Sequence, residues 1–499
     1  MDGSGGNIGE SLCQLCAVVM HGRRRRRSQG KSMTGKQDQQ RSESDYLGTV
    51  QIPDHALYGV NTVRGVENLT VSSRRVGTQR EFVRAFALCK WAAALANRDL
   101  GVIDVPQCDA IVSACKELAD GPLDAFMVVD LLEGSGGTST NMNVNEVLAN
   151  RAQQMLGGKA GVYDLVHPND HVNRSQSTND VYPAAMKIAT HALLEPLMAE
   201  VRALAASFKV KAEDFSQMLH LGRTCLQDAQ PMTLGQLFGG YASLTCRLAD
   251  EISRVRDSLL ALPLGGTAIG TGFGAPKGYK ARVYAHLGQI TGVAYRSAED
   301  PFDAMQNLDT FVRVSGELRT CATSLGKIAS DLILLSSGPN GGVSELELPA
   351  VQAGSSIMPG KINPVLPMSM VQIGFAVTGN DVCVAQANQA GQLEINHFEP
   401  VVADRIFDSI HLLQNGVRLF RQKCVDGIRA HASANEDRLM RSSAIATALI
   451  PRLGYAKVSA LVRQATLQNR NLLDVLQEQN LLSRDQALAL TRDSTVIDR

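Results

Sequence analysis

The chain has 499 residues, of which 44% are hydrophobic and 20% charged, and its 49 basic side chains balance its 49 acidic ones. A neutral chain lacks the basic face that general nucleic-acid binding requires, and no apolar run approaches the roughly 20 residues of a membrane-spanning helix. The length predicts two to four domains, and the ten scattered cysteines predict reduced thiols in a cytoplasmic protein.

Residues 1–45 are rich in Gly, Ser, Gln and Arg, and they are predicted to form a disordered N-terminal extension. Cys13 and Cys16 have the spacing of a metal or redox pair, but no second pair accompanies them. The five arginines from Arg23 to Arg27 could be a targeting signal, although a solvated basic run is the simpler interpretation. We therefore assign no function to this extension.

From residue 46 onward the sequence favours helices over strands. Segments 81–101 and 109–121 have the pattern of helices that end at glycine. Further helices are predicted over 183–215, with a break or bend near Pro196, and over 233–261, 364–390 and 401–421. The clearest pattern is an apolar stripe with spacings of three and four, which predicts a long bundle helix: Phe311, Val314, Leu318, Cys321, Leu325, Ile328, Leu332 and Leu335. The predicted fold class is mainly α.

Four loops rich in small polar residues interrupt these helices, at 133–152, 167–183, 222–236 and 354–364. Their glycines allow a ligand to approach the backbone closely, and their hydroxyls, amides and one lysine can bind carboxylates without a metal. The alternative for each single loop is structural, because Ser, Thr and Asn are favoured helix caps and turn formers. Asn363 before Pro364, for example, has the pattern of an N-cap followed by proline at the first helical position.

Two other motifs give weaker signals. The segment 266–278 has glycines at the spacing of a nucleotide-binding loop, but it follows a helix and lacks both the Lys-Ser/Thr ending and a βαβ frame. His167 and His171 could bind a metal from one face of a helix, but the intervening Pro168 and Asn169 favour a turn. We therefore predict no metal and no cofactor.

Taken together, the four loops carry a resemblance to a known family. The segments GTSTNMNVNEVLANRA, HPNDHVN, SQSTND, GRT, LQDA, PMTLGQ, GGTAIGTG, LLSSGP, GSSIMPGKINP and AGQLEIN follow one another in the family's order. With these motifs the chain resembles the aspartase/fumarase superfamily over residues 46–499, and within it the aspartases.

The resemblance implies a reaction and a set of roles. Members of this superfamily release fumarate from a succinyl-type substrate by anti elimination, without a cofactor, through a doubly charged aci-carboxylate. By match to the family motif, Ser355 would be the base, acting as an alkoxide. The substrate-binding residues would be Thr138, Ser177, Thr178 and Ser356 for the β-carboxylate, Lys361, Asn363 and Thr224 for the α-carboxylate, and Asn179, with Thr138, for the amino group.

The resemblance also implies a mainly α, three-domain fold with a central bundle of long helices. We expect an N-terminal domain over 46–178, the bundle over 179–433, and a small helical domain over 434–499. In this superfamily the polar loops meet only between subunits. The chain is therefore expected to form a homotetramer in which each site draws on three subunits, with a small dicarboxylate as the substrate.

The sequence departs from the family pattern at two positions that would determine specificity. Fumarases carry histidine after GRT and a glutamate shortly after the KxNP motif, and aspartases keep the glutamate with histidine or glutamine at the first position. Here these positions hold Cys225 and Met368. Ammonia release from L-aspartate remains the leading hypothesis. The alternatives are a lyase that releases fumarate from an N-substituted aspartate or related C4 diacid, then a fumarase, then a catalytically silent structural homologue; Cys225 as a nucleophile is disfavoured because no histidine is placed to activate it.

Overall fold

The computed structural model describes residues 39–496 of the chain. The chain divides into two units, Met1–Gln40 and Arg41–Arg499, and the second unit forms the helical fold. The interpretations of Cys13, Cys16 and the arginine run Arg23–Arg27 fall outside the described residues.

The structure corrects the last residues of the predicted extension. Strand β1, Gln40–Asp45, pairs with β2, Gly48–Pro53, so residues 40–45 are ordered. The Arg41 guanidinium donates hydrogen bonds to the carbonyl oxygens of Ala56 and Tyr58, at 2.7 Å each, and pairs with the buried Glu43. Composition suggested disorder here, but these long-range contacts satisfy the polar groups and hold the strand.

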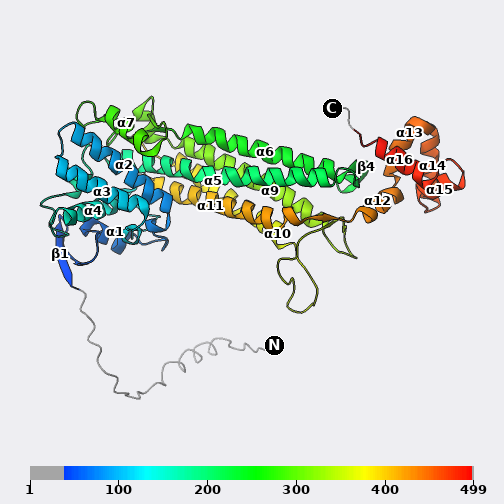
Figure 1. Cartoon of the computed structure of the whole chain (residues 1–499), viewed down its shortest axis with the longest axis horizontal. Helices are drawn as coiled ribbons and strands as arrows, with labels where there is room; N and C mark the ends of the chain where they lie inside the picture. The colour runs from blue at the N-terminus through cyan, green and yellow to red at the C-terminus, as the bar shows by residue number, and fades with distance from the viewer. Residues whose placement is uncertain (1–38, 497–499) are drawn as a thin grey trace, which may run out of the picture. The chain divides into compact units, whose positions relative to one another are not determined.

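The chain is mainly α, as predicted, and its centre is a bundle of five long helices (Figure 1). Within the bundle α5 packs on α6 and α11, and α9 packs on α6, α10 and α11. The five helices are α5 Thr178–Asp214, α6 Leu234–Ser258, α9 Asp309–Leu335, α10 Val365–Gln389 and α11 Glu399–Lys423. Their bounds agree closely with the segments that periodicity predicted.

Two of these helices test the sequence patterns directly. All eight residues of the apolar stripe on α9 are buried, from Phe311 to Leu335, which confirms the prediction of a bundle helix. Of the predicted break or bend near Pro196, a break is wrong, because the helix continues without interruption through Pro183 and Pro196, and a bend stays a prediction. Packing of its buried face on α2, α6 and α11 outweighs the hydrogen bonds that the prolines remove.

Smaller helices pack on the end of the bundle where α5 begins, and there α2 contacts α5, α3 and α7 (Figure 1). They are α1 Val60–Leu69, α2 Arg80–Asp99, α3 Val105–Asp120, α4 Thr138–Met155, α7 Tyr279–Thr291 and α8 Pro301–Gln306. The predicted helices 81–101 and 109–121 are α2 and α3, and α3 ends at Gly121 in the left-handed conformation.

A second hydrophobic core lies among the C-terminal helices, and it includes a hairpin from the middle of the chain. Strands β3, Leu219–Thr224, and β4, Gln227–Thr233, pair antiparallel, and Leu219 and Leu221 are buried in this core. The helices are α12 Ala432–Arg441, α13 Ala446–Leu453, α14 Tyr455–Leu467, α15 Leu472–Glu478 and α16 Arg484–Asp493. The division of the chain at 46–178, 179–433 and 434–499 stays a prediction.

Two short strand pairs complete the secondary structure. Strand β5, Ala261–Leu262, pairs parallel with β6, Arg296–Ser297, and β7, Leu346–Glu347, pairs antiparallel with β8, Arg429–Ala430. Within residues 39–496, no helix combines the length and the apolar character that crossing a membrane requires.

Candidate active site

Thr138 and Thr178 lie in the first turns of two neighbouring helices. Thr138 begins α4 and is exposed, and Gly137 before it has φ +91°, so a side chain there would be strained. A Cβ on Gly137 would also lie 2.4 Å from the Tyr182 ring, so the glycine lets α5 pack directly under the α4 N-terminus. Asn141 Nδ2 donates to Thr178 Oγ1 at 3.1 Å and links the two helices. Two helix N-termini at one place favour a bound carboxylate.

Ser177 is the N-cap of α5. Its hydroxyl accepts from the Asn179 amide at 3.2 Å, while its own amide donates to Asp180 Oδ1 at 2.9 Å, which forms a capping box. Ser177 therefore has the structural role of a helix cap, which was the alternative to substrate binding for residues of this loop. Its role as a substrate ligand stays a prediction. The Asn179 side chain donates to the Ala268 carbonyl oxygen at 2.8 Å.

A buried lysine that the sequence analysis did not single out lies behind these residues. Lys90 is fully buried on α2, and its ammonium donates to Asn173 Oδ1 at 2.9 Å. Asn141 Nδ2 donates to the same oxygen at 3.2 Å, so Lys90 connects through Asn173 to the Thr178 contact. Burial lowers the pKa of Lys90 to about 7, although the nearby Asp180 opposes the shift. A lysine within the apolar segment AFALCKWAAALA was the available signal.

Glu133 was also missed, and it fixes the loop that precedes Thr138. Its buried carboxylate accepts from the Ser139 amide at 2.9 Å, from the Thr140 amide at 3.2 Å, and from the hydroxyls of Ser135 and Thr140. Burial raises the pKa of Glu133 despite these donors. The carboxylate therefore caps α4 from within its own loop.

The loop 354–363 folds around the Ser355 hydroxyl. Ser355 Oγ accepts from the Met358 amide at 3.0 Å and from the Ile357 amide at 3.2 Å. The Gly354 amide donates to the Lys361 carbonyl at 2.8 Å and closes the loop. A Cβ on Gly354 would lie 2.6 Å from that same carbonyl oxygen, so only glycine fits. Two backbone amides thus point at the oxygen that would carry the negative charge of an alkoxide.

Asn363 does not cap α10, which corrects the structural alternative considered for it. The helix begins at Val365, its N-cap is Pro364, and no side chain caps it. Asn363 Nδ2 instead donates to the Gly354 carbonyl at 2.6 Å and braces the Ser355 loop. The Asn363 side chain forms this hydrogen bond at the base of the loop instead of the helix-capping hydrogen bond that its position before Pro364 would favour. Ser356 and Lys361 are exposed on the same loop.

Thr224 and Cys225 lie at the tip of the β3–β4 hairpin. Cys225 has φ +53° and Leu226 has φ +63°, so both turn residues adopt the left-handed conformation that non-glycine residues rarely adopt. Both are exposed, and so is Thr224. Met368, in the first turn of α10, is 44% exposed. The two positions that are predicted to determine specificity therefore present a thiol and a thioether at the surface of the chain.

A buried carboxylate connects the hairpin to the chain that leads into the Ser355 loop. Glu345 is 1% exposed, and its two oxygens lie 2.8 Å from His220 Nδ1 and 2.5 Å from an Arg223 nitrogen. Arg438 on α12 pairs with it at 3.1 Å. Burial alone would raise the pKa of Glu345, but the adjacent His220 and the hydrogen bond from Arg223 lower the pKa to about 2. We call these four residues the Glu345 cluster.

The predicted site residues fall into two groups within one chain. Thr138, Ser177, Thr178 and Asn179 gather where α4 and α5 begin, whereas Thr224 lies beyond the far end of α5. A helix of 37 residues spans about 55 Å, so one chain does not bring the two groups together. The Glu345 cluster joins the hairpin to the segment before the Ser355 loop, so this segment belongs with the group that contains Thr224.

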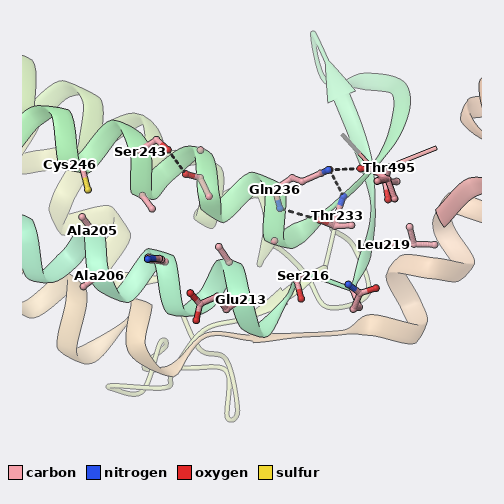
Figure 2. Close-up of a pocket in the computed structure, with 18 of the residues that line it drawn as sticks. Ala205, Ala206, Glu213, Ser216, Leu219, Thr233, Gln236, Ser243, Cys246 and Thr495 are labelled. Atoms are coloured by element: carbon pink, nitrogen blue, oxygen red, sulfur yellow. Dashed lines mark hydrogen bonds between the residues drawn. The ribbon is translucent and has the colours of Figure 1, made fainter. Parts of the chain in front are cut away.

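A pocket in the described part of the chain lies away from all these residues. It has a volume of about 1160 Å³ and is lined by α5, α6 and C-terminal residues between Arg492 and Val496 (Figure 2). The Gln236 side chain donates to the Thr495 carbonyl at 2.7 Å within it. None of the predicted site residues lines this pocket, which is consistent with a site that a single chain does not complete.

The two histidines that were considered as metal ligands accept hydrogen bonds from backbone amides. His167 is the N-cap of a short π-helix, Pro168–Val172, that contains His171, and His171 Nδ1 accepts from the His167 amide at 2.8 Å. His167 Nδ1 faces the amides of Asn169 and Asp170 at 3.2 Å each. Among residues 39–496, no group of three or more His, Cys, Asp or Glu side chains is arranged to hold a metal.

Comparison with known proteins gives consistent matches. A family model described as Lyase matches residues 48–379. The chain is 43% identical over 446 residues to an aspartate ammonia-lyase of Helicobacter pylori, covering 89% of this chain and 95% of that one. It is 41% identical over 445 residues to an aspartate ammonia-lyase of Escherichia coli, covering 89% and 93%.

Solved structures resemble the fold closely. A Brucella melitensis protein titled fumarate lyase:delta crystallin, bound to cobalt, superimposes with a TM-score of 0.90 at 40% identity, covering 92% of this chain and 100% of that one. A class II fumarase from Schistosoma mansoni gives a TM-score of 0.86 at 33% identity, covering 92% and 99%.

Proposed function

This chain belongs to the aspartase/fumarase superfamily of lyases, and on that premise we propose that it is an aspartate ammonia-lyase, which releases ammonia from L-aspartate and forms fumarate. The observation that carries the proposal is the pair of backbone amides directed at Ser355 Oγ. They favour the charged form of a hydroxyl in the loop where the base is expected.

The chemistry requires the site to stabilise a second negative charge. Ser355 removes the proton next to the β-carboxylate, which becomes a doubly charged aci-carboxylate, and ammonia then leaves from the neighbouring carbon. The N-termini of α4 and α5, with Thr138 and Thr178 at their starts, supply dipoles and hydroxyl donors for that charge. The buried ammonium of Lys90 adds positive potential behind them.

Activation of Ser355 needs more than the two amides. Hydrogen bonds to a charged group contribute about 1.5–3 kcal/mol each, so two of them lower the pKa of a hydroxyl by roughly 2–4 units. A serine hydroxyl ionises far above neutral pH, so further stabilisation is required. Lys361, on the same loop, supplies the remainder, and exclusion of water on substrate binding strengthens its electrostatic interaction with the alkoxide.

We propose further that the protein is a homotetramer in which three subunits contribute to each site. The separation of the two groups of site residues along the length of α5 supports a site shared between at least two subunits, because the reaction needs both groups around one substrate, and the contribution of a third subunit rests on the family resemblance. We also propose a cytoplasmic location. Its support is a set of buried, unpaired thiols that a reducing compartment preserves: Cys89, Cys108, Cys115, Cys321 and Cys424.

The test is direct. Purified protein is mixed with L-aspartate, and fumarate is followed by its ultraviolet absorbance while ammonia is measured in parallel. Equal amounts of the two products are expected, and Ser355→Ala should reduce the rate by roughly 1,000-fold or more without changing the melting temperature. Fumarate formation from malate alone would instead indicate a fumarase, and no product from any C4 diacid would indicate a silent homologue.

A second candidate function is favoured by the hairpin tip. Cys225 and Met368 present weakly polar sulfur atoms where a leaving amine would be recognised, and a thiol is a poor partner for ammonium. A lyase for N-substituted aspartates would turn over those substrates faster than L-aspartate. Cys225→Gln combined with Met368→Glu would then shift the preference back toward L-aspartate.

A further inference from the structure

The glycine-rich loop that resembles a nucleotide-binding segment has so far no role in the proposed reaction. Gly265, which precedes this segment, and its first residues, 266–270, fold against the N-terminus of α5. Asp180 Oδ2 accepts from the Gly265 amide at 2.8 Å and from the Thr267 amide at 3.1 Å. The loop is therefore held by a residue of the SQSTND motif, 85 positions away in the sequence.

Asp180 performs two tasks with its two oxygens. Oδ1 accepts from the Ser177 amide at 2.9 Å and completes the α5 cap, while Oδ2 holds the loop. The side chain is fully buried, and burial raises its pKa to about 6 although the backbone donors oppose the shift. A capping residue alone would not need the second set of contacts.

The loop in turn fixes the side chain next to Asp180. Asn179 Nδ2 lies 2.8 Å from the Ala268 carbonyl oxygen. A carbonyl oxygen only accepts hydrogen bonds, so the amide group of Asn179 must face Ala268 and its Oδ1 must lie on the opposite branch. An oxygen is the atom that can accept a hydrogen bond from a substrate ammonium group.

We propose that Asp180 is a positioning residue, which holds the loop 265–268 so that the Ala268 carbonyl orients the Asn179 carboxamide with its oxygen toward the substrate amine. The glycine-rich loop thereby belongs to the amine-recognition part of the site and not to a nucleotide site. This inference rests on the proposed function, because it assigns the amino group of L-aspartate as the ligand of Asn179.

The experiment separates recognition of the amine from recognition of the carboxylates. In the Ser355→Ala background, which binds without turnover, calorimetry measures the Kd of L-aspartate and of succinate, which has both carboxylates but no amine. Asp180→Ala should raise the Kd of L-aspartate about tenfold, the loss of one oriented hydrogen bond to a charged group, and change that of succinate less than about threefold. Equal weakening of both ligands would mean a merely structural role and would overturn the inference.

A double-mutant cycle tests whether Asp180 acts through Asn179. If it does, Asp180→Ala combined with Asn179→Ala should weaken L-aspartate binding no more than Asn179→Ala alone. Additive effects would contradict the proposal.

A second variant reaches the loop without changing α5, in case Asp180→Ala does not fold. Gly270 has φ +102°, and a Cβ there would lie 3.0 Å from the Phe302 amide, so Gly270→Ala displaces the segment next to Ala268. The same selective loss of L-aspartate binding is expected. Gly274→Ala is the matched control, because Gly274 also has positive φ but no atom of the described residues within 4 Å of its Cβ position.

The outcome for this inference is distinguishable from that for the proposed function. Binding of L-aspartate without fumarate formation by the wild-type protein would refute the ammonia-lyase and leave the binding test intact. A parent protein that binds succinate but does not bind L-aspartate would refute both.

Discussion

At the scale of single residues, the buried Lys90 donates to Asn173 and has no carboxylate within hydrogen-bonding distance in the described part of the chain. The Lys90 charge is desolvated, and a buried charge without a charged partner lowers the free energy of unfolding. We infer that it is retained for the positive potential that it adds behind the substrate carboxylates.

We predict that Lys90→Met lowers kcat/KM for L-aspartate by roughly tenfold or more while the melting temperature stays equal or rises. A methionine fills similar volume without a buried charge, and Asn173 keeps its hydrogen bond from Asn141. Steady-state kinetics and a thermal melt on the same preparation check both parts. A large fall in melting temperature with unchanged kcat/KM would show that Lys90 serves the fold and not the reaction.

At the scale of secondary-structure elements, the hairpin that carries Thr224 belongs with the C-terminal helices. Its Leu219 and Leu221 lie in their core, and Ser442 donates to Asp228 on β4 at 2.6 Å. The Glu345 cluster then ties the hairpin and α12 to the segment leading to the Ser355 loop. The position of Thr224 therefore depends on a charge cluster as well as on apolar packing.

The cluster predicts a pH dependence of stability. The folded-state pKa of Glu345 is about 2, below the 4.5 of a free glutamate, so the unfolded chain takes up this proton first as pH falls. The stabilisation is complete above pH 4.5 and is lost between pH 4.5 and 2, and it amounts to about 3 kcal/mol. Urea unfolding followed across this range should show the slope in the wild-type protein.

A matched pair of variants isolates this effect. Glu345→Gln should remove the slope that this group contributes and lower stability at neutral pH, because two arginines lose their partner. Glu347→Gln, two residues away at an exposed position, should leave the pH profile unchanged. Identical profiles for Glu345→Gln and the wild-type protein would exclude the cluster as the source of acid sensitivity.

At the scale of the whole molecule, the predicted site residues of one chain lie in two separate sets. One set lies at the start of α5 and the other beyond its end, about 55 Å of helix apart. If sites form between subunits, a defect in one set can be compensated by an intact set from a neighbouring chain. This separation makes the assembly testable without a structure of the oligomer.

We predict that two inactive variants restore activity when they are unfolded together and reassembled. Thr138→Ala affects one set and Ser355→Ala the other, so random mixing gives about a quarter of the sites with both sets intact. Fumarate formation should recover to about that fraction of the wild-type rate. Mixing Ser355→Ala with Lys361→Ala, which affect the same loop, is the control and should give no recovery. Equal results for both mixtures would contradict shared sites.

The sequence by itself determined the helices of the bundle and the loops that carry chemistry. The stripe on α9 predicted its buried face residue by residue, because helical periodicity is a local property of the chain. The polar loops were found for the same reason, since hydroxyls and glycines between apolar segments need no knowledge of distant contacts. The roles assigned to Ser355 and its partners came from resemblance, and those roles stay predictions.

Only the tertiary structure decided which groups support those loops. Lys90, Asp180 and Glu345 are ordinary charged residues in the sequence, and their importance comes from burial and from partners that include residues more than 80 positions away. Asn363 braces a loop instead of capping a helix, and α5 continues through two prolines. In each case long-range packing outweighed a local preference, because contacts across the fold contribute more free energy than a single cap or backbone hydrogen bond.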